Sequence, residues 1–482
     1  MNANATACSP DALNMSQPTA TIAQTDGRLG QLLKALPTIV ADIYHARTER
    51  HRAQRDAFAV FGVRCASAGL LYLSQIVLAR WMGGNEYGIY VFVWTWVMIL
   101  GGLSDLGLGV GTIRFIPHYR EGGDKAHVRG MFLGASLLSF AVGAAVAVAC
   151  AGLLHFFKPF DDAFMMPAYV ALLCIPFYSL SWVQDGIGKA FAWMSLSMVP
   201  PYVLRPALVL TCMILAMAFG LPMVAITAAA AAVVATAGAS IVQAVLMRVR
   251  VRETVGKGSR SYDFPLWLKA SWPLLIVNAS ELTLQSADVL IVSHYMSPTD
   301  VAIYFAAAKT MSLILFVHYA VGSSVANRFS ALAARGDKDA LNSFAREASH
   351  WTFWPSLAAG VGILALGIPL LWLFGPQFVA GYPVMLILVA GFLFRAAMGP
   401  SEFLLNMLGK QQISAVVQVS MALSSIALNL LLVPLYGLIG AAIATSLVLS
   451  LGALANSVAV SRTLGIEVAV WRNLKRAKRE NA

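Results

Sequence analysis

Apolar runs of more than twenty residues recur between positions 58 and 460, separated by short polar stretches. Polar and apolar residues do not alternate within these runs, so the pattern predicts helices rather than strands. About twenty apolar residues suffice for a helix to cross a hydrocarbon core roughly 30 Å thick, and a helix satisfies its own backbone hydrogen bonds in lipid. We therefore predict an all-α integral membrane protein. The twelve expected spans lie near 58–81, 88–111, 129–153, 165–186, 195–219, 222–246, 265–295, 299–326, 349–374, 383–404, 413–433 and 438–460.

The composition agrees with a bilayer as solvent. Of the 482 residues, 59% are hydrophobic and 12% are charged, whereas roughly 25% are charged in a soluble domain. The net charge of +11 would suggest nucleic acid as the partner of a soluble chain. Here the basic residues gather in alternate loops, so we expect no nucleic acid partner, and both termini are expected in the cytoplasm. Examples from these loops are Arg114, Arg129, Arg248, Arg252, Arg335 and Lys338, and the tail adds Arg472, Lys475 and Arg476.

Residues 1–57 are expected to form a cytoplasmic N-terminal segment. Apolar residues between Leu29 and Tyr44 recur at helical spacing, and Arg47, Arg50 and Arg52 follow them. This pattern is typical of an amphipathic helix on an anionic membrane surface. A solvated lead-in with some helix is an equally open interpretation.

Neither a metal, nor a cofactor, nor an enzymatic activity is expected. The five cysteines show neither Cys-x-x-Cys spacing nor the spacing of a Cys/His metal site. The chain lacks the Gly-x-x-x-x-Gly-Lys-Ser/Thr loop of nucleotide-driven proteins. A polyprenyl-dependent glycosyltransferase would present large external loops with catalytic carboxylates, and the longest external connection, about 154–164, is too short. A membrane scaffold without transport activity remains a further alternative.

The chain contains a repeat. The segment LARWMGGNEYGIY, which ends at Tyr90, has a faded copy that ends at Tyr304. Arg114-Phe115 recurs as Arg328-Phe329, and Gly123-Asp124-Lys125 recurs as Gly336-Asp337-Lys338. The offset is nearly constant, since 304 − 90 and 328 − 114 both give 214 and 338 − 125 gives 213, and six spans separate the copies. We therefore predict two homologous six-helix lobes related by a pseudo-two-fold axis along the membrane normal, with a cavity between them. In each copy the aspartate is expected to cap the next helix.

The first copy resembles a known family. The segment LARWMGGNEYGIY, together with Leu103–Gly107, Arg114-Phe115 and Gly123-Asp124, resembles the polysaccharide transporter, or O-antigen flippase, family. That family belongs to the multidrug/oligosaccharidyl-lipid/polysaccharide exporter superfamily. SADVLIVSHYMSPTDVAIY is similar to the matching signature of span 7, except that His294 and Ala302 stand where Arg80 and Gly88 stand in the first copy.

The resemblance covers residues 58–460 and implies a function. The expected activity is outward flipping of an undecaprenyl-pyrophosphate-linked oligosaccharide across the bacterial cytoplasmic (inner) membrane by alternating access. Expected partners are this lipid-linked oligosaccharide, membrane lipid, and a polysaccharide polymerase or other export protein. The alternative is a cation-coupled multidrug exporter of the same superfamily, which would need an acidic cavity and no central arginine. The expected domains are an N-lobe at 58–246, a basic linker at 247–264, a C-lobe at 265–460 and a basic tail at 461–482.

A polar stripe in span 7 points to a cavity. Its four residues follow at steps of three, four and three and therefore share one helix face: Asn278, Glu281, Gln285 and Asp288. The equivalent positions in span 1, found by subtracting 214 from these numbers, are Arg64, Ser67, Leu71 and Ser74. Because an ionisable group at a span centre costs about 2.5–3.5 kcal/mol, we interpret the stripes as facing walls of a wet cavity lined by spans 1, 2, 7 and 8. Contacts between helices within each lobe are the alternative.

Four cations within the spans are candidate ligands for the pyrophosphate head group: Arg64, Arg205, Lys309 and Arg395. Guanidinium forks and ammonium groups are the side chains that phosphate oxygens favour. Three structural roles remain open. Lys309 could pair with Asp288, Arg395 could pair with Glu402, and Arg205 could cap carbonyls where three prolines break span 5.

The acidic and aromatic residues allow fewer conclusions. Glu281 and Asp288, deep in span 7, are the candidates for binding a coupling H⁺ or Na⁺. Asp105, Asp185 and Glu402 are expected to pair with loop arginines such as Arg114. Several aromatic residues could stack on sugars but equally anchor span ends, so no sugar site is predicted: Tyr72, Tyr90, Trp94, Trp96, Trp182, Tyr202 and Tyr304.

Overall fold

The computed structural model describes residues 49–158, 160–335 and 337–471. The chain divides into two compact units, Met1–Arg64 and Cys65–Ala482. The expected amphipathic helix before residue 49 and the basic tail after residue 471 lie outside the described residues. Within the described residues every regular element is a helix, so the fold is all-α, as the apolar pattern predicts.

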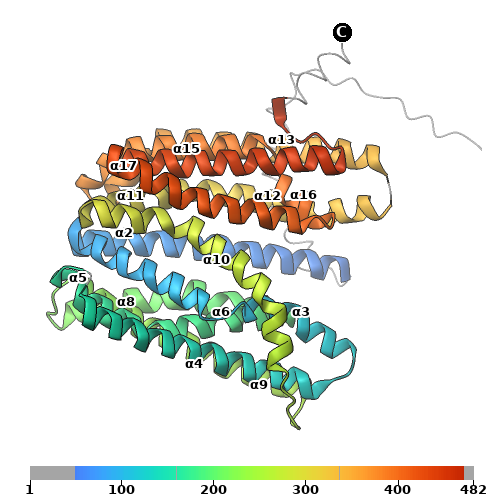
Figure 1. Cartoon of the computed structure of the whole chain (residues 1–482), viewed down its shortest axis with the longest axis horizontal. Coiled ribbons are helices and arrows are strands. Elements are labelled where there is room, and N and C mark those ends of the chain that lie inside the picture. Colours follow the sequence, from blue (N-terminus) through green and yellow to red (C-terminus); the bar gives the residue numbers. More distant parts are fainter. Residues whose placement is uncertain (1–48, 159, 336, 472–482) are drawn as a thin grey trace, which may run out of the picture. The chain divides into compact units, whose positions relative to one another are not determined.

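In the described part of the chain, nine helical elements follow one another between residues 49 and 255, and we call residues 65–255 the N-terminal half (Figure 1). They are α2 (Glu49–Leu103), α3 (Leu108–Glu121), α4 (Lys125–Phe157), α5 (Asp162–Leu172), α6 (Ile175–Ala190), α7 (Met194–Val199), the π-helix η2 (Pro200–Leu204), α8 (Arg205–Ala218) and α9 (Ala225–Val255). The expected break in span 5 is a π-helical turn at the proline pair, and Met194–Ala218 remains one continuous span.

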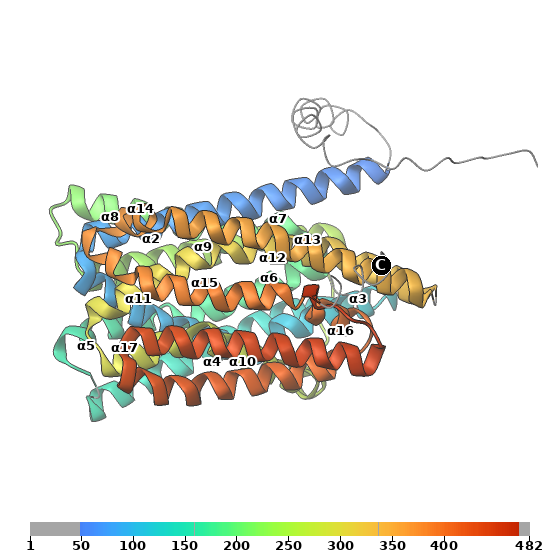
Figure 2. The ribbon, with the colours of Figure 1, turned by 90° about the horizontal axis from the view of Figure 1, so that it is seen from above.

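Residues 264–471 form the C-terminal half (Figures 1 and 2). Its elements are α10 (Phe264–Tyr295), α11 (Pro298–Met311), α12 (Leu313–Ala334), α13 (Lys338–Ala365), α14 (Gly367–Phe374), the 3₁₀-helix η3 (Pro376–Gly381), α15 (Tyr382–Ala397), α16 (Ser401–Met407) and α17 (Gln411–Leu464). The expected eighth span is broken at Ser312, where α11 ends and α12 begins.

Two of the longest helices fold back on themselves. In α2, Tyr87 donates a hydrogen bond to Gln75 at 2.9 Å, although a straight helix would separate residues twelve apart by about 18 Å. The reversal falls at Gly83, whose φ of 75° favours glycine. In α17 the reversal falls at Gly437 with φ 58°, and its two arms lie side by side in Figures 1 and 2. Each of these helices therefore supplies two membrane passes.

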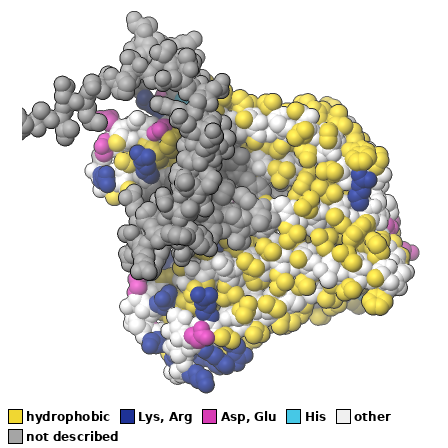
Figure 3. Space-filling model, turned by 180° about the vertical axis from the view of Figure 1, so that it is seen from behind, with side chains coloured by type: hydrophobic (Ala, Val, Ile, Leu, Met, Phe, Trp, Pro, Cys, Tyr) yellow, Lys and Arg dark blue, Asp and Glu magenta, His cyan; other side chains and the backbone are white. Residues whose placement is uncertain are grey.

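These two reversals explain how fewer long helices can supply the twelve expected spans. In the described residues, seven helices are long and apolar enough to cross a membrane, and two helix pairs bent by 46° and 61° qualify if each is one span. The segments Ser67–Glu121 and Gln411–Leu464 count once each among the seven but each pass twice. The bent pairs and α11 with α12 complete the set of twelve. The hydrophobic face in Figure 3, with Lys and Arg gathered towards one end, is the surface that such a bundle presents to lipid.

The first helix of each half packs against the other half. Tyr72 of α2 is 2.9 Å from Thr310 of α11, hydroxyl to hydroxyl, and Arg80 donates to the carbonyls of Trp372 and Leu373 at 2.8 and 2.7 Å. Conversely, Trp267 of α10 is fully buried among side chains of the N-terminal half and donates to the Tyr119 hydroxyl at 2.9 Å. The two halves are therefore joined by exchanged helices, not only by facing surfaces.

The repeated landmarks occupy equivalent places. Asp124 accepts a hydrogen bond from the His127 amide at 3.0 Å and begins α4. Asp337 accepts from the Ala340 amide at 2.9 Å and begins α13. The expected aspartate caps are thus confirmed in both copies. The turn before each second helix also meets its counterpart, since a Cβ atom on Gly88 would lie 1.7 Å from the Pro298 carbonyl oxygen.

Candidate functional site

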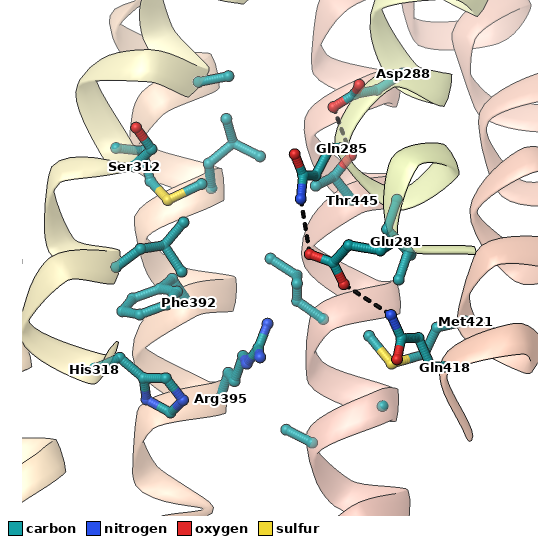
Figure 4. A pocket seen from close by; sticks show the side chains of 18 of the residues that line it. Glu281, Gln285, Asp288, Ser312, His318, Phe392, Arg395, Gln418, Met421 and Thr445 are labelled. Carbon is teal, nitrogen blue, oxygen red and sulfur yellow. Dashed lines mark hydrogen bonds between the residues drawn. The ribbon is translucent and has the colours of Figure 1, made fainter. Parts of the chain in front are cut away.

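A cavity of about 360 Å³ lies inside the C-terminal half. Its described lining residues fall between Glu281 and Asn456 and come from α10, α11, α12, α15, α16 and α17. The long apolar helices are thus interrupted by polar side chains on the faces that meet there, some of which Figure 4 labels. The volume is within the range of small-molecule sites.

Glu281 forms the centre of an amide network on one wall. Its two carboxylate oxygens accept hydrogen bonds from Gln285 at 2.7 Å and from Gln418 at 2.8 Å, and Figure 4 shows both bonds. Gln285 lies one turn further along α10, whereas Gln418 lies on α17. The carboxylate is therefore held between two helices and aimed into the cavity.

Asp288 lies two turns from Glu281 and is buried. Its carboxylate accepts from the Tyr304 hydroxyl at 2.7 Å, from the Thr445 hydroxyl at 3.4 Å and from its neighbour's amide at 2.8 Å. Three helices, α10, α11 and α17, thus meet at one acidic group. Such a buried carboxylate is stabilised by its donors.

Two of the predicted cations lie in this cavity. The guanidinium of Arg395 on α15 is 3.1 Å from the Glu402 carboxylate of α16, so the alternative pairing considered for Arg395 is present. The ammonium of Lys309 lies 4.9 Å from the centre of the Phe305 ring. Lys309 and Asp288 both line the cavity. They do not form an ion pair within 4.0 Å among the described residues.

The polar stripe of span 7 divides between two environments. Glu281, Gln285 and Asp288 line the cavity, whereas Asn278 donates to the Gly102 carbonyl of the N-terminal half at 3.2 Å. Asn278 is therefore a contact between the halves and not a lining residue. The reason is that α10 crosses from one half to the other, so one face of the helix meets different neighbours along its length.

The expected opposite wall from span 1 is not part of this cavity. Ser67 and Ser74 are buried in α2, and Ser74 donates to the Leu71 carbonyl at 2.7 Å. Arg64 lies in α2, but its side chain is outside those that the structure describes. The lining of this cavity comes from the C-terminal half, and the expected cavity between the halves, lined by spans 1, 2, 7 and 8, stays a prediction.

Arg205 belongs to a different environment in the N-terminal half. Its guanidinium carbon lies 5.4 Å from the Trp94 ring centre and 5.3 Å from that of Tyr178. The Pro200 carbonyl accepts a hydrogen bond from the main-chain amide of Arg205, five residues on, as in a π-helical turn. The local backbone therefore satisfies that carbonyl, and the side chain is directed to the two rings.

The expected pairing of cytoplasmic-end carboxylates with loop arginines is wrong for the described residues. Asp105 accepts from the amides of Gly107 and Gly109 at 2.8 and 3.1 Å, at the start of α3. Asp185 pairs with Lys189 and also accepts from the Ser197 hydroxyl. Local partners are closer in sequence and need less ordering than a distant loop side chain.

Sequence reasoning missed three polar lining residues, His318, Gln418 and Thr445, and it considered Tyr304 only as an aromatic residue that could stack on sugars. Each of the three missed residues interrupts an apolar run, but without the charge that identified Glu281. No three His, Cys, Asp or Glu side chains in the described part of the chain are grouped so that they could hold a metal ion.

Comparison with known proteins gives a family and a fold. The sequence model described as "Polysaccharide biosynthesis protein" matches residues 53–327, more than half of the chain. A Shigella flexneri protein, whose name assigns it provisionally to O-antigen transport, is 24% identical over 406 residues, which are 78% of this chain and 90% of that protein.

Two solved structures share the fold. An inward-facing multidrug resistance transporter of the MATE family, in the MOP superfamily, has a TM-score of 0.68 and 16% identity, covering 81% of this chain and 92% of its own. The lipid II flippase MurJ in an inward closed conformation has a TM-score of 0.63 and 14% identity, covering 84% and 87%. At these identities the likeness concerns the fold alone.

Proposed function

We propose that this chain, which belongs to the polysaccharide biosynthesis protein family, is a flippase for a lipid-linked oligosaccharide. Its substrate would be an undecaprenyl-pyrophosphate-linked repeat unit, moved outward across the bacterial inner membrane, with both termini of the protein in the cytoplasm. The Shigella flexneri relative named for O-antigen transport supports the substrate class, and the fold is one that a lipid II flippase also has.

The observation that carries the proposal is the presence of two cations within one membrane cavity. Lys309 and Arg395 both line it, and the pyrophosphate that joins the lipid to the sugar has anionic oxygens that such donors bind. Arg64 remains a proposed head-group ligand from the N-terminal half, whereas the Arg205 side chain lies against two aromatic rings in a different environment. The amide groups of Gln285 and Gln418 provide further hydrogen bonds beside the cations.

We propose alternating access as the mechanism. In this structure the turns that begin the second helix of each half are in contact at Gly88 and Pro298. In the proposed cycle these turns separate after the head group has entered from the cytoplasmic side, while the polyprenyl tail stays in lipid. Each negative charge that leaves a negative interior gains about 2.3 kcal/mol per 100 mV. A polymerase or other export protein would receive the glycan.

A cation-coupled multidrug exporter of the same fold is the second candidate. Three carboxylates, Glu281, Asp288 and Glu402, line the cavity alongside the two cations, and an acidic wall suits a cationic drug. Glu281 and Asp288 would then bind the coupling H⁺ or Na⁺. In the flippase the same pair would couple export to an ion gradient.

Substitution of Arg395 separates the candidates. In a strain lacking the gene, we expect plasmid-borne Arg395→Gln and Lys309→Gln to leave the lipid-linked oligosaccharide inside the cell, as measured in lipid extracts and by loss of the exported polysaccharide. The matched control is Lys158→Gln, which removes an exposed cation outside the cavity.

A structural role of Arg395 needs its own control. The double variant Arg395→Gln/Glu402→Gln removes the unpaired carboxylate that the single variant leaves. Export that returns in the double variant would mean that Arg395 acts only through the ion pair. Intact glycan export together with altered drug resistance would favour the multidrug exporter instead.

A further inference from the structure

A second recess, in the N-terminal half, has chemistry unlike that of the cavity. Four of its residues lie on one face of α6, at steps of three, one and three: Tyr178, Ser181, Trp182 and Asp185. Pro201, Tyr202 and Arg205 close it from η2 and the start of α8. A π-helical turn is a rare feature that often marks a functional position.

The aromatic groups of the recess are arranged around the guanidinium. The guanidinium carbon of Arg205 lies 5.4 and 5.3 Å from the ring centres of Trp94 and Tyr178. The protein's own cation thus occupies the position over the rings that a cationic ligand would otherwise take. The Tyr202 side chain is 41% exposed at the edge. The enclosed volume is only about 40 Å³, so a ligand would lie against the mouth rather than inside.

We propose that this recess binds a sugar ring of the carried glycan, an inference that rests on the proposed flippase function. An aromatic ring offers an apolar face with polar groups at its edge, and a sugar presents apolar C–H faces with hydroxyls around its rim. Arg205 can donate to those hydroxyls, whereas the Ser181 hydroxyl and the Asp185 carboxylate are already bonded to Ser240 and Lys189. Arg205 thus binds the hydroxyls of the sugar, while Lys309 and Arg395 bind the pyrophosphate.

The occupant is distinguished from the alternatives by charge. A pyrophosphate finds one cation among the described lining residues of the recess and two among those of the cavity, so the cavity is the better site for the anion. A cationic drug would be repelled by the guanidinium that already covers two of the rings. A neutral polyhydroxylated ring needs no opposite charge.

Binding to the full-length protein in nanodiscs tests this assignment. One probe is the polyprenyl-pyrophosphate oligosaccharide extracted from a strain that lacks the gene, and the other is undecaprenyl pyrophosphate without sugar. We expect the wild type to bind the glycan-bearing lipid more tightly. Tyr202→Ala and Trp182→Ala should each reduce that preference by roughly tenfold, which corresponds to about 1.4 kcal/mol, and leave the affinity for the sugar-free lipid within about twofold.

Trp96→Ala is the matched control, since Trp96 lies in the same helix as Trp94 and is 37% exposed outside the recess. Because Trp182 is half-buried, Tyr202→Ala remains informative if Trp182→Ala does not fold. If folded Tyr202→Ala prefers the glycan-bearing lipid over the sugar-free lipid as strongly as the wild type does, the sugar site is overturned and the flippase proposal stands. A wild type that shows no preference between the two lipids would have the same consequence. A wild type that binds neither probe would overturn both.

Discussion

The contact between Gly88 and Pro298 allows a direct test of the proposed cycle. A Cβ atom on Gly88 would lie 1.7 Å from the Pro298 carbonyl oxygen and 2.4 Å from its carbonyl carbon. Side-chain Cβ atoms essentially never approach other atoms within 3.0 Å, so the two turns must separate by at least the difference between 1.7 Å and 3.0 Å. The atoms in the way are backbone, which no rotamer change can move.

Gly88→Ala should therefore weaken this contact between the halves. Overpacking of a close interface typically costs about 1–3 kcal/mol, which shifts a two-state equilibrium by roughly 5- to 150-fold. The conformation with separated turns does not contain the overlap. The ratio of separated to contacting molecules should therefore rise by that factor. Gly152→Ala is the matched control, because Gly152 is also helical and nothing lies within 4 Å of a Cβ atom there.

Spin-label distance measurements in nanodiscs give the readout. Labels at Asn85 and Tyr295, both exposed, lie three residues before Gly88 and Pro298 respectively, in a background from which the five native cysteines have been removed. We expect a new, longer population in Gly88→Ala and an unchanged distribution in Gly152→Ala. A Gly88→Ala distribution identical to that of the wild type would show that the turns need not separate, and the reasoning would fail.

Two further outcomes follow from contacts outside the cavity. Arg80→Ala removes both hydrogen bonds to the Trp372 and Leu373 carbonyls and should lower the stability of the folded protein by about 0.5–1.5 kcal/mol. Arg80→Lys should recover only part of that loss. Thermal unfolding in nanodiscs measures both variants, and unfolding temperatures equal to that of the wild type would contradict the prediction. The His127 amide and ring hold the pKa of Asp124 below its ordinary value of 3.8, so its stabilisation of the first turn of α4 is complete above pH 3.8 and is lost as pH falls through the lower folded pKa. Hydrogen exchange should therefore distinguish Asp124→Ala from the wild type at pH 7 and not well below pH 3.8; a difference that persists in acid would contradict the cap.

Part of the site was predictable from residue type alone. Glu281, Asp288, Lys309 and Arg395 stand out because a charge within an apolar span needs a compensating partner, and all four line the cavity. The helix caps at Asp124 and Asp337 were predictable for a related reason, since the cap pattern is local. Gln418 and Thr445 carried a weaker signal, because an amide or hydroxyl in a span costs less than a charge and is less conspicuous.

The sequence by itself determined the solvent, the number of passes and the duplication, because apolar length, basic loops and a constant offset are properties of the chain read in one dimension. It did not determine which spans meet. Only the tertiary structure placed the cavity within the C-terminal half and moved Asn278 to a contact with Gly102. The physical reason is that α10 and the first arm of α2 pack across the halves, so a shared helix face faces different neighbours along its length. Helical spacing fixes the direction of a side chain around its own axis, while the packing of distant helices fixes what that side chain meets.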